Sequence, residues 1–221
     1  AATLATYAMV AVSIAMGAMS FFAKKPNTSA SSLSGGTTET VKEPTAARRV
    51  IYGNVRVGGV ILFIESLNDD NDLHLVIELA GHEVEGIDEI YFDEHLAFDA
   101  SGAVSSRYSG KASLEKRLGA PDQTAFPGLV AASSRWTSDH RCRGRAVIHV
   151  KLVYEQGLWT GGLPNITAMV RGKKVYDPRN ATTYYSQNAA LCVADYLSDT
   201  AYGMGAAYGS EIDSTQLAAA A

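Results

Sequence analysis

Four carboxylates stand close together in one polar stretch, and they are Glu83, Glu85, Asp88 and Glu89. Two carboxylates in one cleft can hydrolyse a glycosidic bond, one as a general acid and the other as a base or nucleophile. Only nearness in the sequence groups these four. The stretch is a candidate for acid–base chemistry, and the sequence does not select a pair.

An acidic loop before the next expected strand suggests calcium binding. If Asn68 is the first position of the loop, Asp70 and Asp72 take the third and fifth. The sixth position is Leu73 where an EF-hand needs glycine, and the twelfth is Leu79 where it needs glutamate. We therefore interpret this loop as a solvated turn.

Histidine and cysteine show no metal-binding or nucleophilic pattern. The five histidines include no close pair at metal-binding spacing on a helix. His82 and His95 lie beside acidic residues at polar strand ends, where an acid–base role is one reading and a structural role the favoured one. Cys142 and Cys192 stand far apart in no paired motif. Because the nucleophile elbow and the phosphate-binding glycine loops are also missing, we expect no cofactor, no metal and no enzyme.

Basic residues gather at two places in a chain whose formal net charge is -4. Arg141, Arg143 and Arg145 alternate just before an expected strand, which predicts that they share one face. They could line a passage for a polyanion or form salt bridges to a neighbouring subunit. The overall acidity excludes wholesale polyanion binding, so either role is local.

The second basic place is the tip "VRGKK". The sequence predicts a strand at 166–170, a tight turn at Arg171-Gly172 and a returning strand at 173–176. We expect a structural hairpin rather than a phosphate site, with Lys173 and Lys174 solvated at the turn. If the tip faced a channel, its cations could make weak, salt-dependent phosphate contacts without sequence preference.

The elements that must position these residues are mainly strands. Residues 48–64, 74–81, 90–92, 96–98 and 146–154 are β-branched or alternating runs separated by turn residues. In the last run, Ala146, Ile148 and Val150 share one face, and Val147 and His149 share the other. The polar insertion 100–132 shows one possible helical turn at 113–118. We expect a mainly antiparallel β-domain with some helix.

The ends of the chain are expected to be helical. Residues 1–23 carry no charge and are long enough to span a bilayer. Spacings of three and four residues give a seam of large side chains beside a seam of small ones, which suits self-association: Met9, Val12, Met16 and Met19, and Ala8, Ala11, Ala15 and Ala18. Residues 24–47 form a Ser/Thr/Gly/Pro linker.

The sequence predicts a β-rich domain at 48–185 and a helical segment at 186–221 that begins a further domain. Ser186 is placed to cap the first helix, and Asp213 to cap the second with Gln216 three residues on. The second helix begins well and is cut short, so we expect the chain to be part of a longer protein.

A long, ordered series of residues from Arg48 to the end resembles one known family. The series includes "RVIYGNVRVGG", "LAGHEVEGIDEIYFDE", "GLPN", Gly172-Lys173, Val175-Tyr176-Asp177, Arg179, Tyr185-Ser186, Asn188, Ala190-Leu191, Asp195-Tyr196-Leu197 and Tyr202-Gly203. It resembles the central tail-hub, or tip attachment, proteins of long-tailed bacteriophages of the lambda type. The resemblance covers roughly residues 48–221.

The resemblance implies a homotrimeric ring of β-domains at the tip of a phage tail in the virion. Such a ring caps the tail tube, joins it to the central fibre and surrounds the exit for DNA. The implied partners are two further copies of the chain, other tail-tip and distal tail proteins, and passing DNA without sequence preference. Residues 1–23 could bundle on the axis as a plug, hold the tape-measure protein or enter the host membrane. The expected interface residues are Arg171, Gly172, Lys173, Lys174, Tyr176, Asp177 and Arg179.

Two other classes stay open. One is a membrane-anchored β-rich binding module, although Lys24-Lys25 after the apolar segment place the linker on the cytoplasmic side, which suits an external β-domain poorly. The other is an envelope-degrading enzyme at the tail tip, which would need two of the four clustered carboxylates in one cleft.

Overall fold

The computed structural model describes Thr40 and residues 47–221. The expected helix 1–23, with its seam of methionines and valine and its seam of alanines, lies outside the described residues. So does most of the linker expected at 24–47. No helix in the described part of the chain combines the length and apolar character needed to cross a membrane.

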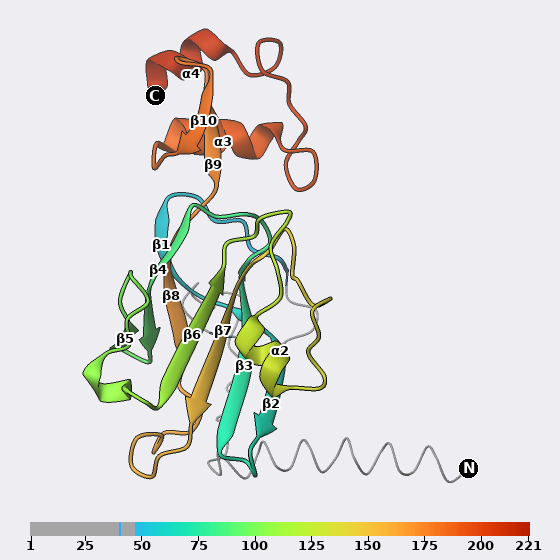
Figure 1. Ribbon diagram of the computed structural model, residues 1–221. Coiled ribbons are helices and arrows are strands. Elements are labelled where there is room, and N and C mark those ends of the chain that lie inside the picture. Colours follow the sequence, from blue (N-terminus) through green and yellow to red (C-terminus); the bar gives the residue numbers. More distant parts are fainter. Residues whose placement is uncertain (1–39, 41–46) are drawn as a thin grey trace.

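Strands dominate the described residues, with short helices between and after them (Figure 1). The strands are β1 (Asn54–Gly58), β2 (Val60–Leu67), β3 (Asp72–Ala80), β4 (Gly86–Phe92), β5 (His95–Phe98), β6 (Ala112–Arg117), β7 (Ala146–Val153), β8 (Ile166–Arg171), β9 (Lys174–Asp177) and β10 (Thr182–Tyr185). The helices are η1 (Ser106–Tyr108), α2 (Pro127–Ala132), α3 (Ala189–Ser198) and α4 (Ser214–Ala220).

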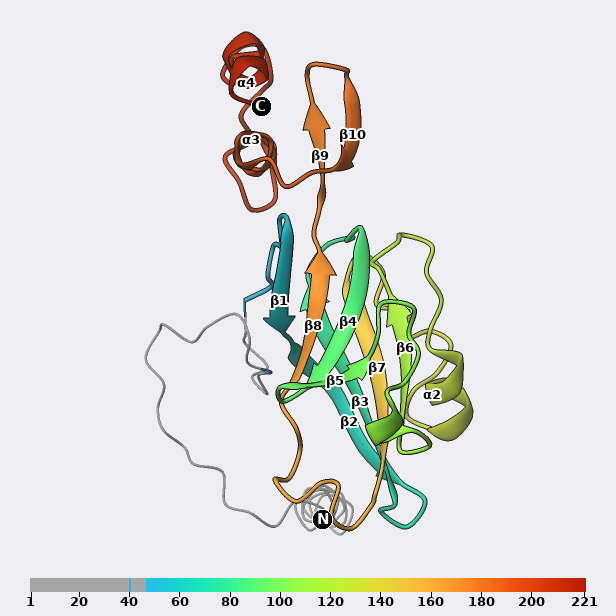
Figure 2. The same cartoon turned by 90° about the vertical axis from the view of Figure 1, so that its left-hand side faces the viewer.

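Two four-stranded sheets face each other as a sandwich. One has the order β1-β8-β4-β5, the other β2-β3-β7-β6, and every pairing is antiparallel. The strands β9 and β10 form a separate antiparallel hairpin beyond the end of the sandwich (Figure 2). The predicted mainly antiparallel β fold is confirmed for the described residues.

The main core lies between the two sheets. Period-two alternation sends every second side chain of a strand inward, where its apolar surface leaves water. The buried inward set includes Leu73, Leu75, Ile77, Ile90, Phe92, Ala146, Ile148, Val150, Leu152, Ile166, Ala168 and Val170. The face predicted for Ala146, Ile148 and Val150 is confirmed.

The outer face of the second sheet is covered as well. Phe126 at the N-cap of α2, Leu129 within the helix and Trp136 after it pack on the outer face of β3 and β7, against Val76 and Val147. Both faces of β7 are therefore buried. The helical turn expected at 113–118 was wrong, because these residues form edge strand β6 and pair with β7. The ladder hydrogen bonds override the local preference for helix in this short, charged stretch.

Residues 174–221, which we call the C-terminal unit, share a smaller core. Val175 of β9 packs with Leu191 and Ala194 of α3 and with Leu217 of α4. This packing groups β9 and β10 with the helices, whereas the sequence predicted that the helical segment begins at residue 186. The limits of the domains as independent folding units stay a prediction.

The caps of the two C-terminal helices differ in outcome. Asp213 caps α4 as predicted, its carboxylate accepting from the backbone N–H groups of Thr215 and Gln216. The cap expected at Ser186 was wrong by two residues. Asn188 caps α3 by accepting from Ala190 and Leu191 N–H, and Ser186 Oγ accepts from the Asn188 N–H instead.

Candidate functional site at the connector

The predicted hairpin between β8 and β9 does not form. Strand β8 lies between β1 and β4, and β9 pairs only with β10. Residues 171–174, which we call the connector, carry the chain from β8 into β9 without reversing it (Figure 2). Gly172 N–H donates to Gly53 O at 2.8 Å, and Lys173 N–H donates to Ile51 O at 2.8 Å. The connector thus extends the pairing of β8 to the residues that precede β1.

Gly172 serves close approach rather than a turn. A Cβ atom at this position would lie 2.2 Å from Ile51 O and 2.6 Å from its carbonyl carbon. Its φ is not in the positive range that a glycine turn requires. A glycine between two strands signals either a turn or a close backbone contact, and here the contact explains it.

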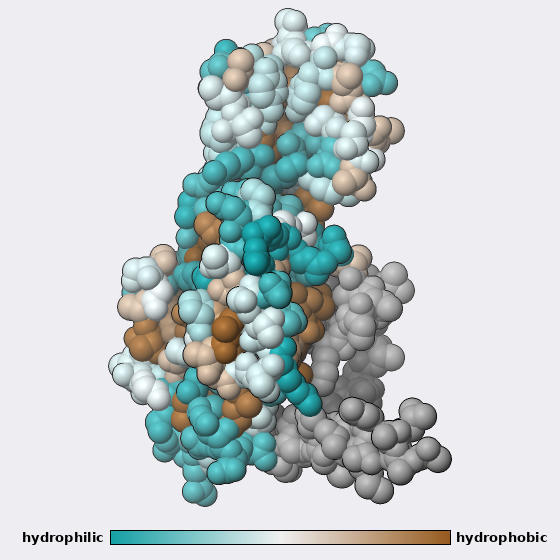
Figure 3. Space-filling view, turned by 45° about the vertical axis from the view of Figure 1, so that its right-hand side comes forward, coloured by the Kyte–Doolittle hydropathy of each residue, from teal (hydrophilic) through white to brown (hydrophobic). Residues whose placement is uncertain are grey.

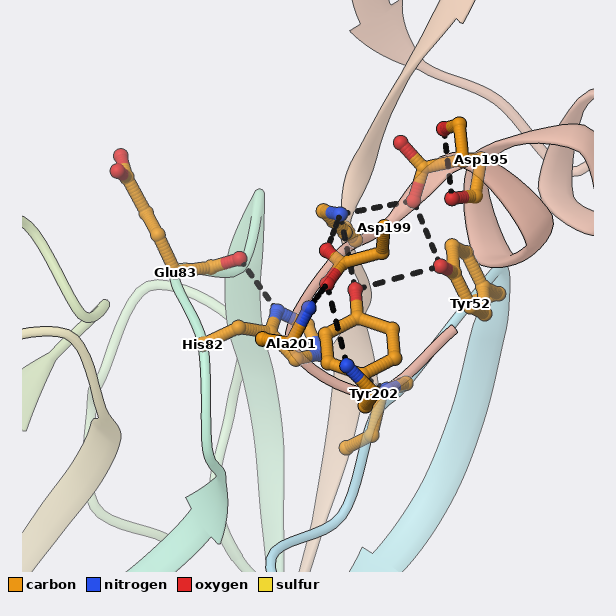
Figure 4. A network of polar contacts seen from close by, with 10 residues as sticks. Tyr52, His82, Glu83, Asp195, Asp199, Ala201 and Tyr202 are labelled. Atoms are coloured by element: carbon orange, nitrogen blue, oxygen red, sulfur yellow. Dashed lines mark hydrogen bonds and ion pairs between the residues drawn. The ribbon is translucent and has the colours of Figure 1, made fainter. Parts of the chain in front are cut away.

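Lys173 ties the sandwich to the C-terminal unit. Its ammonium donates to the carboxylates of Asp195 at 2.8 Å and Asp199 at 3.1 Å, and to Tyr202 Oη at 2.8 Å (Figure 4). Burial opposes the charged form. The hydrogen bonds to Asp195, Tyr202 and Asp199 outweigh that effect and raise the pKa of Lys173 above its usual value. The ammonium therefore stays charged and occupied.

Tyr52, just before β1, and His82, after β3, lie beside this network. Tyr52 Oη donates to Asp195 at 2.6 Å, and its pKa is raised by burial and by that hydrogen bond. His82 Nε2 accepts from Ile51 N–H at 2.8 Å, while its Nδ1 contacts Glu83 O at 2.7 Å. Both bonds together require the neutral tautomer with the proton on Nδ1. Burial lowers the pKa of His82 and favours that neutral form.

The other two cations of the connector also meet carboxylates of their own chain. Arg171 donates two hydrogen bonds of 2.9 and 3.2 Å to the Asp88 carboxylate. This hydrogen bonding to Asp88 raises the pKa of Arg171. Glu85 lies 3.5 Å from Arg171 and 3.4 Å from Lys174. Gly86 makes room, because a Cβ there would lie 2.3 Å from the Arg171 guanidinium.

These pairs bear on two readings of the sequence. We expected the connector cations to be solvated and to meet a neighbouring protein. Each has a carboxylate partner within the chain, because the connector lies against β4 and α3; Lys173 is largely shielded from water, whereas Lys174 is 51% exposed. Contact with a neighbouring protein stays a prediction. Hydrophilic residues gather on the surface where the two parts meet (Figure 3). Glu85 and Asp88 are bound to cations and Glu83 points away from the network (Figure 4). Two of the four clustered carboxylates therefore serve in ion pairs of the connector, and the enzyme reading stays untested.

The remaining predicted interface residues lie farther along the hairpin β9–β10. Asp177 accepts from Arg179 at 2.7 Å and from Tyr184 Oη at 2.7 Å, and the Arg179 hydrogen bonds hold the pKa of Asp177 well below its usual range. Tyr176 contacts the Tyr208 ring edge-on, with centroids 5.2 Å apart. These residues brace the C-terminal unit from within.

The basic residues 141–145 do not share a strand face. Strand β7 begins only at Ala146, and positive φ values at Cys142 and Gly144 break the extended alternation. Arg145 pairs with Glu78 at 2.9 Å and Arg141 approaches Asp139 at 3.6 Å, while Arg143 is exposed. The predicted one-face cluster was therefore wrong, and its role in a channel or subunit contact stays untested.

Sequence reasoning missed a buried histidine pair. His74 Nδ1 and His149 Nε2 lie 3.0 Å apart between neighbouring strands, and His149 Nδ1 lies 2.8 Å from the Glu115 carboxylate. Burial lowers the pKa of His74 to about 4 and also lowers that of His149. The signal was their alternation on the outer faces of β3 and β7. Within the described ranges, no cluster of three or more His, Cys, Asp or Glu side chains is arranged to hold a metal ion.

No model of a known protein family matches this chain, and no curated protein matches it. Among solved structures, the chain is similar to one from the virion of a native gene transfer agent (GTA) particle, with 18% sequence identity and a TM-score of 0.42. That match covers 61% of this chain and 28% of the other. The likeness is too weak to carry an argument about function.

Proposed function

We propose that this chain is a structural component of a bacteriophage-type tail tip and that it forms a homotrimeric hub. The hub caps the tail tube, connects it to the central fibre and surrounds the path of the DNA. Its partners are further copies of the chain and neighbouring tail-tip proteins. In this proposal the chain is not an enzyme.

One observation carries the proposal beyond the sequence resemblance. Some of the residues that carry the resemblance in the C-terminal part build the joint between the sandwich and the C-terminal unit. Gly172 admits Ile51, and Lys173 binds Asp195 and Tyr202. A Cβ at Gly203 would lie 1.8 Å from the Tyr196 carbonyl oxygen. The resembling series thus includes residues that tie the two parts together and residues that pack closely within the C-terminal unit, which supports a structural role.

A second set of shared residues builds the C-terminal unit itself. Val175 and Leu191 are fully buried together, and Asn188 caps α3. These packing and capping contacts support the structural role that we propose.

The decisive experiment is the native mass of the full chain in mild detergent, with and without the adjoining distal tail protein. A trimer, seen as a three-fold ring by electron microscopy, supports the hub. A monomer under both conditions contradicts it. Antibody labelling of particles at the tail tip supports the location, whereas labelling confined to the host membrane favours the anchored binding module.

A further inference from the structure

A cavity of about 280 Å³ lies where three loops of the sandwich meet. Asp93 comes from the turn after β4 and His95 from the start of β5. Helix η1 supplies Arg107 and Tyr108, and the segment 158–164 between β7 and β8 closes the other side. Its volume is near the lower limit of ligand pockets, which run from roughly 300 to 1,000 Å³. The cavity suits one small ring rather than an extended ligand.

The aromatic wall of the cavity is held in place. Trp159 Nε1–H donates to Val153 O at 2.8 Å, and its ring is nearly parallel to that of Tyr108, with centroids 5.7 Å apart. Phe92 packs against both rings at 6.1 and 5.0 Å. The wall is therefore formed before any ligand arrives, which lowers the entropy cost of binding.

The rim of the cavity carries an arginine that has no carboxylate partner among the described residues. Arg107 is exposed and lies over the Tyr108 ring at 5.7 Å, and in the described residues it makes no ion pair. By contrast, Arg56, Arg145 and Arg171 each have a carboxylate partner.

The other rim groups favour hydroxyl-bearing ligands. One oxygen of Asp93 accepts from Asn165 N–H at 2.9 Å, which fixes the carboxylate and leaves its second oxygen as an acceptor. The side chains of His95 and Thr160 are exposed and have no hydrogen bond within the described part of the chain. A sulfate ion could pair with Arg107 but would offer Asp93 no hydroxyl donor.

We propose that this cavity binds one hexuronic acid residue of an acidic saccharide. The carboxylate of the sugar pairs with Arg107 through a charge-assisted hydrogen bond. Its hydroxyls donate to Asp93 and bond Thr160 and His95, and its apolar ring face lies against Trp159. A small, partly exposed site of this kind binds weakly, so a single sugar has a dissociation constant in about the millimolar range.

The test uses the fluorescence of Trp159 in the full-length chain. The sequence has two tryptophans, so Trp136→Phe leaves Trp159 as the only reporter. Glucuronate is expected to change its emission, and glucose to bind about tenfold more weakly. Saturation-transfer NMR on the unaltered chain repeats the measurement without relying on that substitution.

Arg107→Gln is expected to abolish the preference for glucuronate over glucose. Arg143→Gln, at another exposed arginine, is the matched control and is expected to keep the preference. The proposal is overturned if neither method detects glucuronate, or if acetate or glycine binds as well as glucuronate. Equal loss in both arginine variants overturns it too, because the effect would then come from net charge.

Discussion

The ammonium of Lys173 lies 2.8 Å from the carboxylate of Asp195, and this contact joins the last sandwich strand to helix α3. Both side chains are largely shielded from water, with 24% and 13% of their surfaces exposed. Asp199 and Tyr202 bind the same ammonium, and Tyr52 binds the same carboxylate. The joint between the two parts is therefore one polar network with a lysine at its centre.

Lys173→Met is expected to lower the free energy of unfolding by about 2 kcal/mol, because it leaves two shielded carboxylates facing each other without a cation. Urea unfolding monitored by circular dichroism measures this. Lys174→Met is the matched control. Lys174 is 51% exposed and 3.4 Å from Glu85, so its loss should cost less than about 1 kcal/mol. Equal costs for the two variants would contradict the central role of Lys173.

Gly172→Ala tests whether the glycine serves close approach. The added methyl group would meet the Ile51 backbone, which cannot move without disturbing the paired chain. We expect a loss of about 3 kcal/mol in thermal or urea unfolding. Gly161→Ala provides the comparison, because nothing lies within 4 Å of a Cβ there and its φ is not positive. Its stability should stay within about 1 kcal/mol of the unaltered chain. A harmless Gly172→Ala would mean that the connector is not held against Ile51.

Several strands, and the two faces of β7, could be predicted from the sequence because alternation is a local signal. The inward face of β7 and the Asp213 cap were read from neighbouring residues alone. The pairing of β8 could not be, because "VRGKK" carries the same local marks whether glycine turns the chain or lets it pass Ile51. That choice depends on β1, more than a hundred residues away in the sequence.

The candidate site was predicted only in part for the same reason. The basic residues of the connector were visible, but their partners Glu85, Asp88, Asp195 and Asp199 come from both sides of it in the sequence. Because these carboxylates pair with the cations of the connector, the basic residues join the sandwich to the C-terminal unit. The histidine pair was missed because its members lie 75 positions apart and meet only across two strands.

The ion pairs of the connector predict weak contact with DNA. Because Arg171 is held by Asp88 through two hydrogen bonds, Arg171→Gln should leave the slope of log Kobs against log salt for double-stranded DNA unchanged. Filter binding or fluorescence anisotropy over a salt series measures the slope. Arg143→Gln, at an exposed arginine, serves as the control. A drop of about one in the slope for Arg171→Gln alone would restore the phosphate-contact reading.

The buried histidine pair predicts that stability falls in weak acid. His74 faces His149, Lys151, Asp72 and Glu115, and burial lowers its pKa to about 4 from about 6.5 in the unfolded chain. The unfolded state therefore binds more protons than the folded state between these values. The contribution of neutral His74 to the free energy of unfolding is fully present above a pH of about 6.5. It is lost as the pH falls toward 4, which lowers the free energy of unfolding by about 3 kcal/mol.

The measurement is urea unfolding across that pH range for the unaltered chain and for His74→Gln, which cannot titrate there. The variant should be less stable at neutral pH, because it loses packing against His149, yet its stability should depend less on pH. His95→Gln changes an exposed histidine and should leave the pH dependence of the unaltered chain in place. Parallel curves for His74→Gln and the unaltered chain would show that His74 is not excluded from protonation by the fold. In that case the contact with His149 would have to tolerate a charged ring, which two nitrogens 3.0 Å apart allow only if one of them remains an acceptor.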